Sequence, residues 1–286
     1  MVLTLCTLVA TKVSRQTNSF AVTQTKELVT AFISHSVVDQ SAQMPIEEDQ
    51  VIEKCPLLAR YCSWQIVDLV LRSQFDSAEK SNKNIVNGVV SDLLFQIGGL
   101  YEDKSQFREA LELYQTSIRL NTFHNVYVGD VYYRLGVIFQ RKLGDVKLME
   151  SYSAFHSAIQ TQHFSSKQIE ADAYYRYAEV MRWRGVNIVE YIRLYKQATI
   201  IDPDHHMARV WYGLSLYQQS QDVEGALAEI YRVIDTNDLW AKKWAFLYLG
   251  DIYFQEKRYD ESKKMYEQAL QIDSRFLEAQ KRLARD

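Results

Sequence analysis

Apolar, small and polar residues recur in a fixed order along this chain, and the order is clearest in residues 243–276. This stretch reads KKWAFLYLGDIYFQEKRYDESKKMYEQALQIDSR. Aromatic, small and apolar side chains occupy a series of spaced positions, namely Phe246, Leu249, Gly250, Tyr253, Ser262, Tyr266, Ala269 and Ser274. The same order returns upstream at uneven intervals, so the pattern divides most of the chain into repeats.

The spacing resembles that of the tetratricopeptide repeat, W-x2-L-G-x2-Y followed by A, F, A and P, with Ser274 where proline is usual. The resemblance implies two antiparallel helices, about 244–256 and 259–272, which bury their apolar sides on neighbouring copies. The implied fold is all-α, a right-handed α-solenoid of antiparallel helix pairs, with about six copies over residues 57–276. The residue in the small position of each copy would be Ile66, Gly98, Gly136, Ala178, Gly213 and Gly250.

The small position reflects close approach of the two helices of a copy, which leaves no room for a larger side chain. The aromatic positions fill the space between helices, so they are expected in the core and not in a ligand cage. The tyrosines to which this applies are Tyr101, Tyr114, Tyr195, Tyr253 and Tyr266.

Individual copies depart from the pattern. The copy at 57–90 is the most divergent, and the next is expected to begin at Ser91. In the third copy, the second-helix residues arrive three positions late, which indicates a longer helix or an inserted turn around Lys142–Lys147. The fourth copy closes at Asp202-Pro203, because proline lacks the N–H and the free φ that a continuing helix needs.

Two domains are expected. Residues 1–50 form an N-terminal segment with a helix at 24–38 and an acidic linker, and residues 51–286 form the repeat domain. A terminal helix from Arg275 is expected to give the last repeat a polar outer face, through Lys281, Arg282 and Arg285.

The first ten residues, MVLTLCTLVA, are apolar but shorter than the roughly 20 residues that span a bilayer. Two interpretations stay open. The run is a short helix of a cytoplasmic protein, or it is the end of a membrane helix that begins upstream. Membrane association is therefore expected only through the N-terminus.

Composition limits the function classes. With 47% hydrophobic and 24% charged residues, the chain is expected to be globular, and its net charge of −3 provides no field that attracts nucleic acid. Cys6, Cys55 and Cys62 are too few for a disulfide framework. These features favour a protein partner over a nucleic acid.

The sequence contains no Gly-rich phosphate loop, HExxH, G-x-S-x-G or CxxC motif. His205-His206 beside Asp204 suggests a metal, but adjacent helical residues diverge, and Asp204 is explained as the N-cap of the next helix. We therefore expect no catalytic site, no metal and no cofactor.

The resemblance places function on the concave face, which the first helix of each copy lines. The partner-binding residues expected there are Tyr133, Arg134, Tyr175, Arg176, Glu179, Arg182, Trp211, Tyr217, Trp244, Tyr248 and Asp251. Aromatic residues and arginine are enriched in protein-binding hot spots.

The three arginines of this face could hold an acidic side chain or a C-terminal carboxylate through two parallel hydrogen bonds. Alternatively, Arg134 and Arg176 pair locally with Asp130 and Asp172, each four residues earlier. Members of the family that bind heat-shock chaperones use a clamp of Lys, Asn and Arg. Of the matching residues Phe95, Gly99, Arg134, Asp172 and Arg176, only Arg176 agrees with that clamp, so a chaperone clamp is not expected.

Two functions remain. The first is a non-catalytic interaction scaffold that binds a peptide or helix in its groove, as a monomer or weak homodimer. Trp183, Trp240 and Trp244 would suit a dimer interface, unless they pack at repeat junctions. The second is the extramembrane repeat domain of a larger membrane-bound bacterial protein of cell-envelope assembly or glycan processing.

Overall fold

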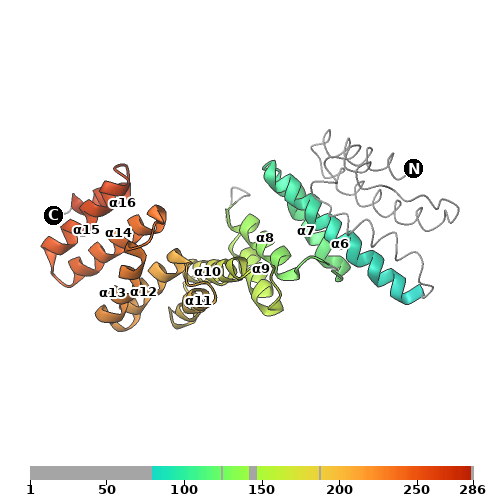
Figure 1. The fold of residues 1–286 in the computed structure, drawn as a ribbon, viewed down its shortest axis with the longest axis horizontal. Coiled ribbons are helices and arrows are strands. Elements are labelled where there is room, and N and C mark those ends of the chain that lie inside the picture. The colour runs from blue at the N-terminus through green and yellow to red at the C-terminus, as the bar shows by residue number, and fades with distance from the viewer. Residues whose placement is uncertain (1–78, 124, 142–146, 187, 285–286) are drawn as a thin grey trace. The chain divides into compact units, whose positions relative to one another are not determined.

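The computed structural model describes residues 79–123, 125–141, 147–186 and 188–284, and every regular element in these ranges is an α-helix (Figure 1). The predictions for the N-terminal segment, for most of the first copy and for the turn at 142–146 lie outside the described residues. The chain divides into two compact units, and the boundary along the sequence falls between Ala154 and Phe155.

Unit 1 contains α6 (Glu79–Asp103), α7 (Phe107–Leu120) and α8 (Val128–Arg141), and α9 (Leu148–Thr161) crosses into unit 2. Helix α7 is apolar on one side, because Ala110, Leu113, Tyr114 and Ser117 recur at helical spacing and are all buried. It packs against both α6 and α8.

The second copy has its small position in close contact as expected, since a Cβ at Gly98 would lie 2.8 Å from Cδ1 of Tyr114, but no helix boundary separates it from the first copy at Ser91. Helix α6 is continuous over 25 residues and passes through this position without a turn. No proline lies between Glu79 and Asp103, and a single glycine at position 88 does not break a helix. The helix ends where Ser105 adopts a left-handed backbone conformation, with φ of 60°.

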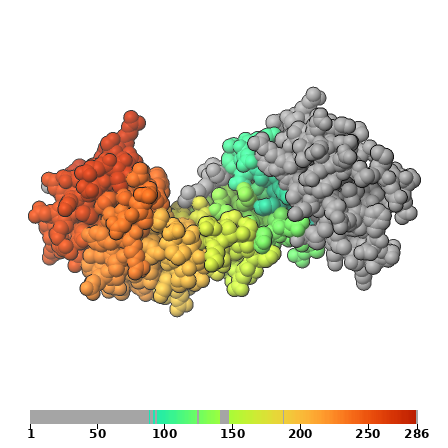
Figure 2. All heavy atoms as spheres, in the orientation of Figure 1, coloured from blue at the N-terminus to red at the C-terminus, as the bar shows by residue number. Residues whose placement is uncertain are grey.

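Unit 2 contains three helix pairs and a terminal helix. The pairs are α10 (Lys167–Trp183) with α11 (Ile188–Ile201), α12 (His206–Ser220) with α13 (Val223–Ile234), and α14 (Leu239–Gln255) with α15 (Tyr259–Ile272). Helix α16 (Leu277–Leu283) packs on α15, and α12 also contacts α14 directly. In the view of Figure 2, the atoms of this unit follow one another without a visible gap from α10, in yellow, to α16, in red.

Helices α14 and α15 confirm the pair expected at 244–256 and 259–272. Helix α14 begins earlier than expected because Asp238 caps it, accepting a hydrogen bond at 3.0 Å from the backbone N–H of Ala241. The turn between the helices is closed by Lys257, whose φ is 61°.

The small position of the repeat is confirmed as a point of close approach. A Cβ at Gly250 would lie 2.6 Å from Cδ1 of Tyr266, and one at Gly213 would lie 2.8 Å from Cγ1 of Ile230. The aromatic positions are confirmed as core, since Tyr101, Tyr114, Tyr195, Tyr253 and Tyr266 are all buried.

Helix α11 ends at Ile201, directly before Asp202-Pro203, as expected. The cap of α12, however, is His205 and not Asp204: Nδ1 of His205 accepts a hydrogen bond at 3.1 Å from the N–H of Ala208. The sequence favoured Asp204 because aspartate is a common cap, but Asp202 and Asp204 belong to the preceding turn.

Candidate functional site

Helices α10, α12 and α14 of unit 2 carry a row of aromatic side chains. Tyr175 from α10 and Trp211 from α12 each pack on Tyr195 of α11, with ring centroids 5.9 and 6.3 Å apart. Trp211 lies 5.1 Å from Tyr248 of α14, and Tyr248 lies 5.7 Å from Trp244. Four of these side chains come from the first helix of their repeat, and we call them the aromatic row: Tyr175, Trp211, Tyr248 and Trp244. All four were expected as partner-binding residues.

Arg182 of α10 lies over this row, with its Cζ 4.1 Å from the centroid of a Trp211 ring. A guanidinium at this distance is attracted to the indole face. Its Nε has no hydrogen-bond acceptor among the described residues. Arg182 therefore keeps donor capacity beside the aromatic row.

The hydroxyl groups of Tyr195 and Tyr248 lie in the field of Arg182. Burial raises the pKa of both, and the positive charge of Arg182 opposes that effect. Glu179 raises the pKa of both tyrosines further. Glu179 is itself buried, so its carboxylate and the guanidinium of Arg182 act on the same two tyrosines.

Arg176 belongs to a polar network at the edge of the row. Its Nε donates to Oδ2 of Asp172 at 2.5 Å, which confirms the local pair expected from the four-residue spacing. Oδ1 of Asp172 lies 3.2 Å from Nε2 of His205. Since Nδ1 of His205 accepts the α12 capping bond, the proton of its neutral ring is on Nε2, which donates to Asp172. The ring of His205 also packs 4.8 Å from that of Tyr175.

Tyr133 and Arg134 lie in unit 1, both partly buried on α8. Nη1 of Arg134 donates to Oε2 of Glu102 at 3.0 Å, a partner on α6 that the four-residue spacing did not predict. The hydroxyl of Tyr114 donates to the same oxygen at 2.9 Å. Tyrosine, carboxylate and arginine thus join three helices of this unit.

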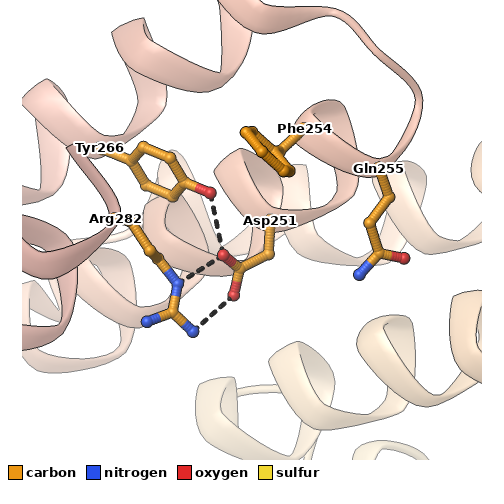
Figure 3. A pocket seen from close by; sticks show the side chains of 5 residues that line it. All are labelled: Asp251, Phe254, Gln255, Tyr266 and Arg282. Carbon is orange, nitrogen blue, oxygen red and sulfur yellow. Dashed lines mark hydrogen bonds and ion pairs between the residues drawn. The ribbon is translucent and has the colours of Figure 1, made fainter. Parts of the chain in front are cut away.

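The same arrangement recurs at the C-terminal end of unit 2. Tyr266 donates to Oδ1 of Asp251 at 2.9 Å, and Nη2 of Arg282 donates to Oδ2 at 2.9 Å (Figure 3). The expectation that Arg282 belongs to the polar outer face is therefore wrong, because its side chain is only 27% exposed and its guanidinium pairs with Asp251 of α14 (Figure 3). Phe254 and Gln255 complete the lining of a pocket of about 320 Å³ at this position.

Tyr217 is buried, and its hydroxyl donates to Oε1 of Glu256 at 2.8 Å, at the end of α14. Burial and the neighbouring carboxylate raise the pKa of Tyr217 to about 12. Like Glu102 and Arg282, Glu256 is a member of these networks that sequence reasoning missed. Glu256 is 39 residues from Tyr217, Glu102 is 32 from Arg134, and Arg282 is 31 from Asp251. No local spacing predicts pairs at these distances.

Alkaline pH is expected to destabilise the fold through the buried tyrosines. Burial raises the pKa of Tyr266 from 10.0 to about 12, and the charge of Asp251 adds to that effect. A proton that the folded state holds more tightly stabilises the fold fully below pH 10. That contribution is lost as the pH rises through 12, so the free energy of unfolding should fall between these values.

The measurement is urea unfolding of the wild type and of Tyr266→Phe, at neutral pH and at about pH 11. Phenylalanine cannot ionise, so the variant should lose less stability on this change of pH than the wild type loses. Equal losses would mean that Tyr266 does not contribute to the alkaline effect.

The described residues contain no group of three His, Cys, Asp or Glu side chains that could hold a metal. His205 and His206 face different carboxylates, since Nδ1 of His206 lies 3.2 Å from Oδ2 of Asp238. Within the same ranges, no helix is both long enough and apolar enough to cross a bilayer.

Trp183 and Trp240 are 41% and 60% exposed, whereas Trp244 packs against Phe276 at 4.8 Å. Self-association through the two exposed indoles stays a prediction. Light scattering at high protein concentration should show a mass above that of the monomer, and Trp240→Ser should lower it. A strictly monomeric mass would contradict the interface.

Residues 244–276 match the family profile of the tetratricopeptide repeat. No curated protein matches the sequence. Among solved structures, YrrB, described as a TPR protein with an unusual peptide-binding site, has 17% identity and a TM-score of 0.51, covering 65% of this chain and 88% of that chain.

Two further structures are similar at lower TM-scores. The thermophilic TPR protein TTC0263 of Thermus thermophilus has 17% identity and a TM-score of 0.43, over 68% of this chain and 97% of that chain. The Rap conjugation gene regulator of the plasmid pLS20, in complex with the Phr* peptide, has 13% identity and a TM-score of 0.44, over 96% and 75%.

Three findings identify the repeat and the fold. The profile match falls on α14 and α15, whose close contact at Gly250 is the one that the repeat requires. The described residues are arranged as packed helix pairs, and the likeness to YrrB shows the same fold. The chain therefore contains a tetratricopeptide repeat at residues 244–276, and its described residues have an α-solenoid fold.

Proposed function

We propose that this protein is a non-catalytic scaffold and that unit 2 binds a segment of a protein partner on the aromatic row. The observation that carries the proposal is the row itself, which extends over α10, α12 and α14 with Arg182 beside it. Tryptophan, tyrosine and arginine are enriched among the few residues that supply most of the binding energy in protein interfaces. YrrB, which shares the fold, has a peptide-binding site, and this supports a peptide ligand as the first candidate.

The expected partner-binding residues contribute unequally to the proposed surface. Trp211 and Trp244 are partly exposed, so they offer contact area without rearrangement. Tyr175 and Tyr248 are buried, and Tyr248 packs against both tryptophans. Asp251 and Tyr217 are already held by Arg282 and Glu256, so we assign them to the scaffold that positions the row.

The experiment is selection of short random peptides by the immobilised full chain, followed by affinity measurement with a synthetic selected peptide. Trp211→Leu should weaken binding by at least about tenfold, since loss of a central tryptophan commonly costs about 2 kcal/mol or more. Ile200→Ala is the matched control, because Ile200 is exposed on α11, on the other helix of its pair. It should bind like the wild type.

Thermal unfolding of both variants checks that the fold is intact. If no peptide is enriched, or if Trp211→Leu binds the selected peptide as tightly as the wild type, the aromatic row is not the binding surface.

A further inference from the structure

The described structure separates the three arginines that were expected on the binding face. Arg134 is engaged by Glu102, and Arg176 is engaged by Asp172. Arg182 has no carboxylate within ion-pair distance among the residues that the structure places. A partly buried guanidinium without such a partner is the position at which a ligand carboxylate would gain most.

The setting of Arg182 also suits an anion. Its guanidinium is held by the face of Trp211, at 4.1 Å, so the donors at its rim remain available for an in-plane partner. Arginine binds carboxylates through two parallel N–H bonds, and an ordered guanidinium loses less conformational entropy on binding.

Nearby donors lack acceptors. Within the described residues, no acceptor is found for Nε of Arg182. The indole Nε1 of Trp244 has none either. A ligand carboxylate would therefore give the Arg182 guanidinium an acceptor that the described residues do not provide.

We propose that Arg182 binds a carboxylate of the partner, so that the segment bound on the aromatic row is an acidic peptide. This inference depends on the proposed function, and it adds the chemical class of the ligand. The carboxylate comes from an Asp or Glu side chain or from a peptide C-terminus, and both sources share the chemistry that Arg182 recognises.

Three acidic groups lie near the aromatic row and bear on the test, namely Asp251, Glu179 and Asp172, the last of which is paired with Arg176. Asp251 is neutralised by Arg282, which donates to both of its oxygens. Glu179 acts on Tyr195 and Tyr248 together with Arg182, so it would repel an acidic ligand and attract a basic one. Removing the charge of Glu179 should therefore strengthen the binding of an acidic ligand and weaken the binding of a basic one.

The test uses the full chain and the peptides selected on it. The enriched peptides should contain Asp, Glu or a required free C-terminus, and an amide in place of that carboxylate should weaken binding by about tenfold or more. Arg182→Gln should weaken binding of the acidic peptide as much as amidation does. This variant should bind the acidic peptide and its amide form with the same affinity. Glu179→Gln should bind the acidic peptide as tightly as the wild type or more tightly.

Amidation of the C-terminus, compared with Asn or Gln at the internal acids, identifies which source supplies the carboxylate. Peptides that require Trp211 but bind equally well without a carboxylate would overturn this inference and leave the proposed function standing. Weaker binding by Glu179→Gln, with Arg182→Gln unaffected, would show a basic ligand instead. Failure to enrich any peptide would overturn both proposals.

Discussion

Replacing Gly250 with leucine is expected to lower the free energy of unfolding by about 3 kcal/mol or more. A Cβ at this position would lie 2.6 Å from Cδ1 of Tyr266 and 3.0 Å from Cζ. The ring has no space to retreat, since Tyr266 is 2% exposed and its hydroxyl is bound to Asp251. Leucine would therefore force α14 and α15 apart.

Urea or thermal unfolding followed by circular dichroism measures this loss. Gly99→Leu is the control, because a Cβ at Gly99 meets only the hydroxyl of Tyr114, at 3.9 Å. The control should lose much less stability than Gly250→Leu. An unchanged melting temperature for Gly250→Leu would contradict the assignment of Gly250 to the small position of a repeat.

Asp251→Ala is expected to destabilise the fold by about 2 kcal/mol. The change leaves the Tyr266 hydroxyl without its acceptor and removes both carboxylate oxygens that accept from Arg282. The ion pair is only partly buried, so the loss should stay below the roughly 3–5 kcal/mol typical of fully buried pairs. Helix α16 should be affected most, because Arg282 is its polar link to α14.

Glu261→Ala is the matched control, since its ion pair with Arg258 is nearly half exposed on both sides. It should change stability much less than Asp251→Ala, because an exposed ion pair contributes little. A double-mutant cycle of Asp251→Ala with Arg282→Ala should give a clear coupling energy. If Asp251→Ala costs no more than Glu261→Ala, the Asp251 network does not hold α16.

The parts of the fold that depend on local spacing could be predicted from the sequence. The α14–α15 pair, the stop before Pro203 and the close contact at Gly250 each follow from residues a few positions apart. The pair of Arg176 with Asp172 is of the same kind, because residues four apart are neighbours on a helix.

Interactions between distant positions could not be predicted in the same way. Glu102 and Arg134 are 32 residues apart, and Asp251 and Arg282 are 31 apart, so each pair forms only when neighbouring repeats pack. The continuity of α6 could not be predicted from the repeat spacing either, because that spacing marks the contact positions of a copy and not where a helix begins. A tyrosine in the second helix, opposite an acid in the first, was the available signal for two of these networks.

Binding on the aromatic row is tested most directly by the indole N–H signals of the tryptophans in an NMR titration with a selected peptide. The assignments come from single Trp→Phe variants. The account predicts that the signals of Trp211 and Trp244 shift as the peptide saturates the protein, while that of Trp183, exposed at the end of α10, stays in place. Peptide binding that moves Trp183 and leaves Trp211 and Trp244 unchanged would contradict it.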